Sequence, residues 1–100
     1  MRLPKRMKLI LDFFPGETEE EKLLSMARSA LKERLRNVSE RISELEAKYA
    51  MTFEEFAQAW EEGRVPEKWS FDVERDYFDW EALLSEKKRL LERLRSLKAG

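Results

Sequence analysis

The chain has neither histidine nor cysteine among its 100 residues, which narrows the chemistry it can perform. Without cysteine it cannot form disulfides, thiolate nucleophiles or cysteine-based metal sites. Without histidine it lacks the commonest general base and the commonest zinc ligand. Its three glycines, Gly16, Gly63 and Gly100, lie too far apart to form a phosphate-binding loop. We therefore expect a protein that is not an enzyme and that holds no cofactor and no metal.

Long hydrophobic runs are also missing. The basic first residues lead into a short apolar stretch at residues 9–11, as a signal peptide does, but Asp12 and Pro15 end it far too early. We expect no membrane segment, and the lack of cysteine gives no sign of an oxidising compartment. The sequence therefore favours a cytoplasmic location.

Charged residues are abundant instead. The chain contains 20 Lys and Arg against 21 Asp and Glu, so that 41% of it is charged and 42% is hydrophobic. Such a composition is typical of thermophile proteins and of long helices. A length of 100 residues suits one domain, and we expect residues 1–100 to fold as a single helical domain.

The clearest helical signal runs from residue 17 to residue 50. Thr18 is suited to the N-cap position, and Glu21, three residues later, to the role of its capping-box partner. From residue 31 onward the apolar positions are spaced alternately by four and three, the repeat of a coiled-coil seam. This seam consists of Leu31, Leu35, Val38, Ile42, Leu45 and Tyr49. A second copy of the chain or another helix of the same chain could cover it, and the pattern leaves both open.

Two further helices are signalled downstream. A short helix is expected at residues 52–63, where Thr52 and Glu55 fit a capping box and Gly63 is typical of the position just past a helix end. A second long helix is expected at residues 71–98, which carry a wide apolar stripe. Beside that stripe lies a row with a spacing of seven, formed by Leu83, Leu90 and Leu97. The apolar rows exceed what one neighbouring helix covers, so we expect a homo-oligomer whose copies meet along the seam and along this row.

Residues 1–16 are the ambiguous segment. Between Met7 and Phe14 the side chains alternate as in a β-strand, and Pro15 and Gly16 close the run. A lone strand cannot satisfy its own backbone groups, so it would pair with another chain; an irregular arm is the alternative. The expected fold class is all-α, with two long helices and one short helix in an elongated hairpin or bundle, preceded by a short strand or arm.

The middle of the chain, residues 50–82, is both acidic and aromatic. It holds ten acidic residues against three basic ones, a net charge of −7, together with eight of the eleven aromatic residues. Aromatic anchors inside a charged rim are typical of protein interfaces, and an acidic surface suits a basic protein better than a nucleic acid. The partner-binding residues that we predict are Trp60, Glu61, Glu62, Trp69, Asp76, Phe78, Asp79 and Trp80. The alternative is that the aromatic residues form a small core at the end of the long helices.

Three segments in and next to this block resemble a known family. They read KYAMTFEEF at residues 48–56, WEEG at residues 60–63 and DYFDWEA at residues 76–82. In order and spacing they are similar to segments of small prokaryotic antitoxins of the TumA-like group. The resemblance implies a chain that binds and neutralises a small basic toxin, an RNA-cleaving one, without catalysis of its own.

Two other functions remain open. A homodimeric helical scaffold or interaction protein would use the seam and leave the aromatic block as ordinary core. A small nucleic-acid-binding helical protein would use the basic N-terminal arm and the cations between Lys87 and Lys98.

Overall fold

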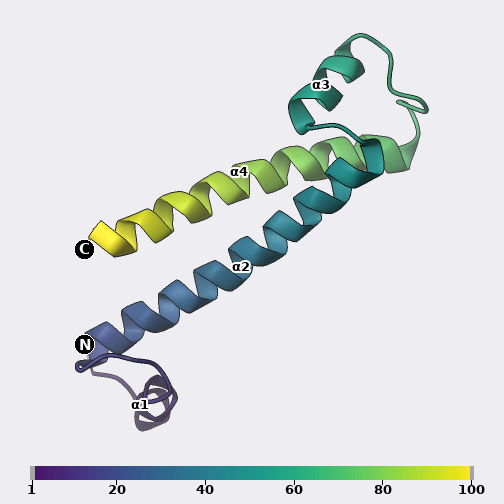
Figure 1. Ribbon diagram of the computed structural model, residues 1–100. Coiled ribbons are helices and arrows are strands. Elements are labelled where there is room, and N and C mark those ends of the chain that lie inside the picture. The colour runs from purple at the N-terminus through teal and green to yellow at the C-terminus, as the bar shows by residue number, and fades with distance from the viewer. Residues whose placement is uncertain (1, 100) are drawn as a thin grey trace.

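The computed structural model describes residues 2–99, and every regular element in that range is a helix (Figure 1). The elements are α1 (Lys5–Leu11), α2 (Glu19–Tyr49), α3 (Phe53–Glu61) and α4 (Phe71–Ala99). The all-α class that the sequence predicts is confirmed, and the three larger helices lie within two residues of their expected bounds. None of the helices in the described range is long and apolar enough to cross a membrane.

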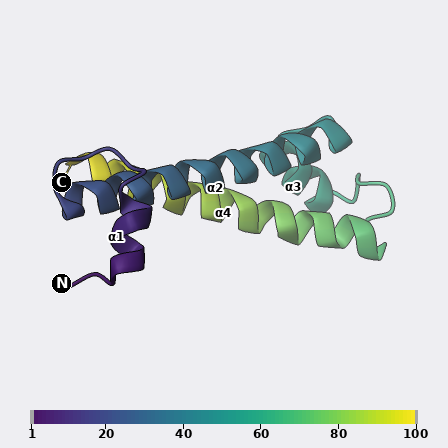
Figure 2. The same cartoon turned by 90° about the horizontal axis from the view of Figure 1, so that it is seen from below.

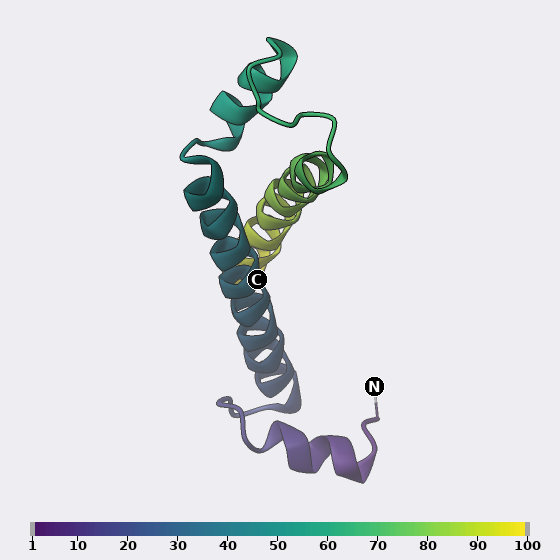
Figure 3. The ribbon, with the colours of Figure 1, turned by 90° about the vertical axis from the view of Figure 1, so that its right-hand side faces the viewer.

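Helices α2 and α4 form an antiparallel hairpin, and α3 lies at the end where the chain turns from one to the other (Figures 1 and 3). The molecule measures 57 × 26 × 21 Å. Its radius of gyration is 19.2 Å, whereas a compact domain of this length has about 13 Å. The hairpin is thus elongated, as predicted, and its two ends are far apart.

The start and end of α2 follow local signals. The Oγ1 atom of Thr18 accepts a 3.1 Å hydrogen bond from the Glu21 amide, as expected of an N-cap. The Glu21 carboxylate, however, accepts from the amide of Glu17, at 2.6 Å, and not from the amide of Thr18. At the other end Ala50 adopts a left-handed conformation with φ of 54°, and the Met51 amide bonds back to the Glu46 carbonyl at 3.2 Å.

The short helix α3 has the predicted capping box. The Thr52 hydroxyl accepts from the Glu55 amide at 3.2 Å, and the Glu55 carboxylate accepts from the Thr52 amide at 3.1 Å. Gly63, with φ of 70°, turns the chain out of the helix. After the loop, the Ser70 hydroxyl accepts a 3.3 Å hydrogen bond from the Val73 amide and so caps the start of α4.

The predicted N-terminal strand is wrong, because residues 5–11 form helix α1. A lone strand would leave its backbone groups unpaired, whereas a helix bonds its own; the amides of Met7 and Lys8 both donate to the Pro4 carbonyl. Helix α1 packs on the beginning of α2 and buries Leu11. The alternation of apolar residues is too short to exclude a helix with one buried side.

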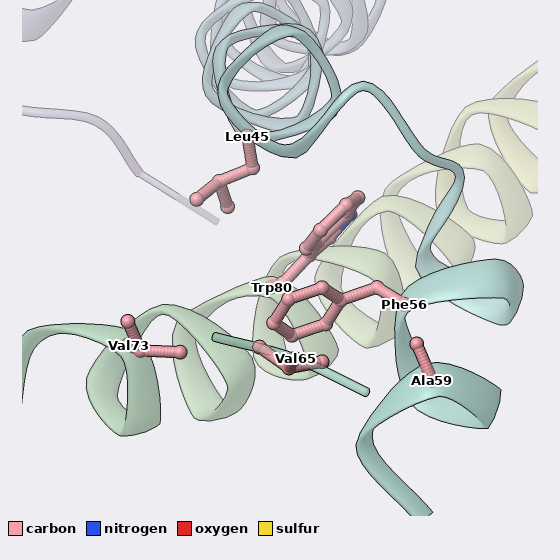
Figure 4. Packing of buried hydrophobic residues seen from close by; sticks show 6 residues of the cluster. All are labelled: Leu45, Phe56, Ala59, Val65, Val73 and Trp80. Atoms are coloured by element: carbon pink, nitrogen blue, oxygen red, sulfur yellow. The ribbon is translucent and has the colours of Figure 1, made fainter. Parts of the chain in front are cut away.

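The core consists of two clusters along the hairpin. Val38, Ile42 and Leu90 form one of them in the middle, with Leu31, Leu35, Leu83 and Leu84 packed around it. The other lies under α3 and includes Leu45 and Trp80 (Figure 4). Outside these clusters, the Arg34 guanidinium of α2 binds the Glu86 carboxylate of α4 with two hydrogen bonds of 2.6 and 2.8 Å.

The seam predicted for an oligomer is therefore used inside the chain. Val38, Ile42 and Leu45 are buried between the helices of one hairpin and cannot also form a contact between copies. The prediction was wrong in placing them at an intermolecular surface. Its other members lie in or beside the same hairpin: Leu90 is buried, and Leu31, Leu35, Tyr49, Leu83 and Leu97 are half-buried. Heptad spacing shows which residues share a face, but it does not show which helix covers that face.

Candidate functional site

The candidate site lies at the closed end of the hairpin, where α3 covers the beginning of α4. An aromatic cluster fills this end, with Trp80 at its centre and completely buried. The Trp80 ring lies 5.3 Å from the ring of Phe56 (Figure 4). It also lies 5.4 Å from the ring of Phe53. The prediction that Trp80 is an exposed anchor is therefore wrong. Part of the aromatic block is core, as the alternative reading proposed.

Trp60 lies at the border between this core and solvent. Its ring centroid is 4.8 Å from that of Tyr77, and the side chain is half-buried. The Lys68 ammonium lies 5.2 Å from the Trp60 centroid on the loop that follows α3. One side of the Trp60 ring thus packs against Tyr77, and a partner could reach only the other side.

Three aromatic side chains at this end of the hairpin are exposed to solvent. The exposed fractions are 82% for Trp69, 75% for Phe71 and 57% for Phe78. Phe71 and Phe78 are seven residues apart on α4 and line one shallow groove together with Glu74 and Arg75. Trp69 lines a separate hollow with Val65 and Lys68, in the loop that leads into α4. We call Trp69, Phe71 and Phe78, which lie within ten positions of the chain, the exposed aromatic face. It contains two of the predicted anchors, Trp69 and Phe78.

The rings of this face already attract cations of the chain itself. The Arg75 guanidinium lies 5.4 Å from the centroid of Phe71, and the Lys68 ammonium lies 5.1 Å from that of Trp69. Both distances are within the range of cation–π attraction. A lysine or arginine side chain of another molecule could bind these rings in the same way, either on the opposite side of a ring or by displacing Lys68 or Arg75.

Several exposed carboxylates lie close to the aromatic face in sequence, and one of them, Glu74, lines the groove of Phe71 and Phe78. Those nearest in sequence are Glu67, Asp72 and Glu74, and the predicted rim residues Glu61 and Glu62 are also exposed. Hydrogen bonds from Arg64 and Gln58 lower the pKa of Glu62, and Arg64 balances part of its charge, as Arg75 does for Asp72 at 3.4 Å. The other predicted rim residue, Asp79, is half-buried and lines a small hollow with Arg41 and Ala82.

Asp76 does not belong to this rim. Only 3% of it is exposed, and its Oδ2 atom accepts hydrogen bonds from Lys48 at 2.5 Å and from the Tyr49 hydroxyl at 2.6 Å. Burial alone would raise the pKa of Asp76, but these two hydrogen bonds and the charges of Lys48 and Arg41 outweigh it and lower the pKa. The prediction that Asp76 steers a partner is wrong, because its charge is used within the chain.

Phe71 and the carboxylates Glu67, Asp72 and Glu74 were not predicted from the sequence. A usable signal was present, since Phe71 and Phe78 are two full turns apart and so share a side of α4. Trp80, two residues after Phe78, falls on the opposite side of the helix. That difference separates the exposed aromatic residues from the buried one.

A second surface of interest lies at the open end of the hairpin. There a groove between α2 and α4 has a floor of Leu91 and Leu94 and four basic side chains around it: Arg28, Lys32, Arg95 and Lys98. No carboxylate lines this groove. Anions would therefore meet only positive charge there.

Comparisons with known proteins give one result. Neither the curated proteins nor the solved structures contain a match to this chain. Among protein families, one matches residues 4–100, which is almost the whole chain. The chain therefore belongs to the family described as Uncharacterized protein MJ0235 family.

Proposed function

We propose that this chain is a non-catalytic binding protein that captures a small basic protein on its exposed aromatic face. The observation that carries the proposal is the exposure of Trp69, Phe71 and Phe78 at one end of the hairpin. Large aromatic side chains are the residues that most often dominate binding energy in interfaces. Here three aromatic side chains are exposed close to exposed carboxylates. Such a surface suits a partner that has both apolar and basic side chains.

The resemblance to TumA-like antitoxins suggests which partner this is. Segments 48–56, 60–63 and 76–82 carry the resemblance, and all three lie at the closed end of the hairpin. A toxin that cleaves RNA needs a cationic surface to hold phosphates, and an acidic protein can bind that surface quickly through long-range attraction. We therefore propose neutralisation of such a toxin, in the cytoplasm, as the function of the chain.

The test is capture of a partner encoded next to this chain. Co-expression with the product of the neighbouring reading frame should give a complex, and Trp69→Ala or Phe78→Ala should weaken it by about 2 kcal/mol without unfolding the hairpin. Leu24→Ala, which removes an exposed apolar side chain near the opposite end of the molecule, is the matched control and should bind as the wild type does.

Two results would overturn the proposal. One is a complex that survives loss of both Trp69 and Phe78, because the binding surface then lies elsewhere. The other is a neighbouring product that shows no affinity for the chain and whose activity the chain does not reduce.

The groove at the open end supports a second candidate, binding of nucleic acid. Its four basic side chains, with no carboxylate among the groove residues, suit a phosphate backbone. RNA or DNA affinity should then fall steeply as salt rises, and Arg95→Glu should reduce both the affinity and the slope. No affinity at low salt would reject this candidate.

A further inference from the structure

The two ends of the hairpin have complementary surfaces. At the N-terminal end, residues 2–14, which we call the basic arm, contain four basic residues and one acidic residue, a net charge of +3. The arm also leaves large apolar side chains in solvent: Leu9, Ile10 and, at 90% exposure, Phe13. The closed end presents the exposed aromatic face in an acidic surrounding. Six of the eight large apolar side chains exposed in the described range belong to one or the other of these surfaces, and Leu24 and Leu91 are the exceptions.

The basic arm is held in place, so the exposure of its apolar residues is not a result of poor docking. Leu11 is buried, the Lys22 ammonium binds the Asp12 carboxylate at 2.9 Å, and the Ser25 hydroxyl donates to the Pro15 carbonyl at 2.8 Å. One side of the arm thus packs on α2. The other side, with Leu9, Ile10 and Phe13, faces away from the chain and has no cover.

The arm and the aromatic face cannot meet within one molecule. The 31 residues of α2 separate them, and a helix of that length spans about 46 Å. Figure 1 shows α1 at one end of the hairpin and the start of α4 at the other. A contact between the two surfaces therefore requires a second copy of the chain.

We propose that two copies of this chain pair side by side and antiparallel, so that the basic arm of each lies on the exposed aromatic face of the other. A two-fold axis makes the two contacts identical and closes the assembly at two copies, which doubles the buried area. Figures 2 and 3 show the backbone of α1 and the start of α4 displaced to the same side of α2, and the pairing requires the side chains of both surfaces to face a partner on that side. The opposite charges favour this pairing and oppose a parallel one.

This inference does not rest on the proposed function, because it concerns the purified chain alone. The arm has the chemistry that the aromatic face selects, namely cations beside apolar side chains. If both proposals hold, a basic partner protein and the arm of the second copy compete for one surface. Either proposal can fail without the other.

The absence of cysteine allows a specific test by cross-linking. A double variant with Ile10→Cys and Phe78→Cys contains no other thiol, and oxidation should join two copies into a closed dimer of twice 12.0 kDa. The single variant Ile10→Cys should cross-link no more at high protein concentration than at low concentration, because an antiparallel dimer holds the two arms apart. A variant with Leu24→Cys and Phe78→Cys is the matched control and should remain uncross-linked.

Light scattering on unmodified cysteine-free protein provides the second measurement. The wild type should have twice the chain mass at low salt and dissociate as salt rises. Phe13→Asp on the arm and Phe78→Asp on the aromatic face should each give monomers that keep wild-type helicity. An equimolar mixture of these two variants should recover part of the dimer, because one intact arm can still bind one intact aromatic face.

Three results would overturn the proposal. The first is a wild type that is monomeric at every concentration tested. The second is cross-linking through Ile10→Cys alone, which would place two arms together. The third is a chain that stays monomeric and binds vesicles of anionic lipid, with loss of vesicle binding in Phe13→Asp, since the arm would then serve a membrane surface.

Discussion

The hydroxyl of Tyr49 donates a 2.6 Å hydrogen bond to the Oδ2 atom of Asp76, which joins the last residue of α2 to the second turn of α4. Lys48 donates to the same oxygen at 2.5 Å, and its side chain is exposed at the edge of the contact. The Tyr49 ring also lies 4.5 Å from that of Phe56, in the cluster under α3. One buried carboxylate thus fixes the closed end of the hairpin and the support of the exposed aromatic face.

Asp76→Asn should make the free energy of unfolding depend less on pH in the acidic range. The folded state lowers the pKa of Asp76, so its contribution is complete above the ordinary value of 3.8 and is lost as pH falls through the lower folded value. In urea titrations, we expect Asp76→Asn to cost about 1 to 3 kcal/mol at neutral pH. The difference from the wild type should shrink below pH 3.8.

Asp79→Asn is the control for that experiment, because Asp79 lies on the same helix and is only half-buried. Its effect at neutral pH should be well below that of Asp76→Asn. Equal losses for both substitutions would show that the hydrogen bonds of Asp76 add no stability.

Ala50→Gly should stabilise the chain. Ala50 has a φ of 54°, a region that costs a residue with a Cβ atom about 1 to 2 kcal/mol. Glycine avoids most of this cost but loses more entropy on folding, so a net gain of about 0.5 to 1 kcal/mol is expected in chemical denaturation. Ala47→Gly, within α2 and exposed, should instead lose about 1 kcal/mol. A loss at both positions would contradict the left-handed cap.

Trp80→Ala should cost the chain far more stability than Phe78→Ala. Trp80 is fully buried, and removing it should cost about 3 to 5 kcal/mol of stability. Phe78 is more than half exposed, and its removal should change stability by less than about 0.5 kcal/mol. Thermal unfolding measures both. A large loss for Phe78→Ala would mean that this ring is part of the core and not of a free surface.

Gly16→Ala should release the basic arm. A Cβ atom there would lie 2.8 Å from the Lys22 amide nitrogen, and the φ of 141° disfavours any side chain. Trypsin should then cut after Lys5, Arg6 or Lys8 faster than in the wild type, while the hairpin keeps its helicity. Gly63→Ala is the matched control, because it has a positive φ but no neighbouring atom within 4 Å. Unchanged cleavage in Gly16→Ala would show that the arm does not depend on this turn.

Local signals in the sequence determined the three larger helices. Thr18, Thr52 and Gly63 act through hydrogen bonds and backbone conformations that involve residues only a few positions away. Such signals need no tertiary context, so the bounds could be predicted closely. The short segment at residues 5–11 lacked them and was assigned wrongly. There the choice between strand and helix depended on packing against α2.

Only the tertiary structure decided which apolar faces are covered and by what. Periodicity placed Val38, Ile42 and Leu45 on one face, but distant parts of the same chain cover that face. Leu90 of α4 packs with Val38 and Ile42, and Leu45 packs in a cluster with residues of α3 and α4. The aromatic block likewise divided into the buried Trp80 and the exposed Trp69, Phe71 and Phe78 according to where α3 folded back. Helical periodicity is a property of neighbouring residues, whereas burial depends on contacts between segments far apart in the chain.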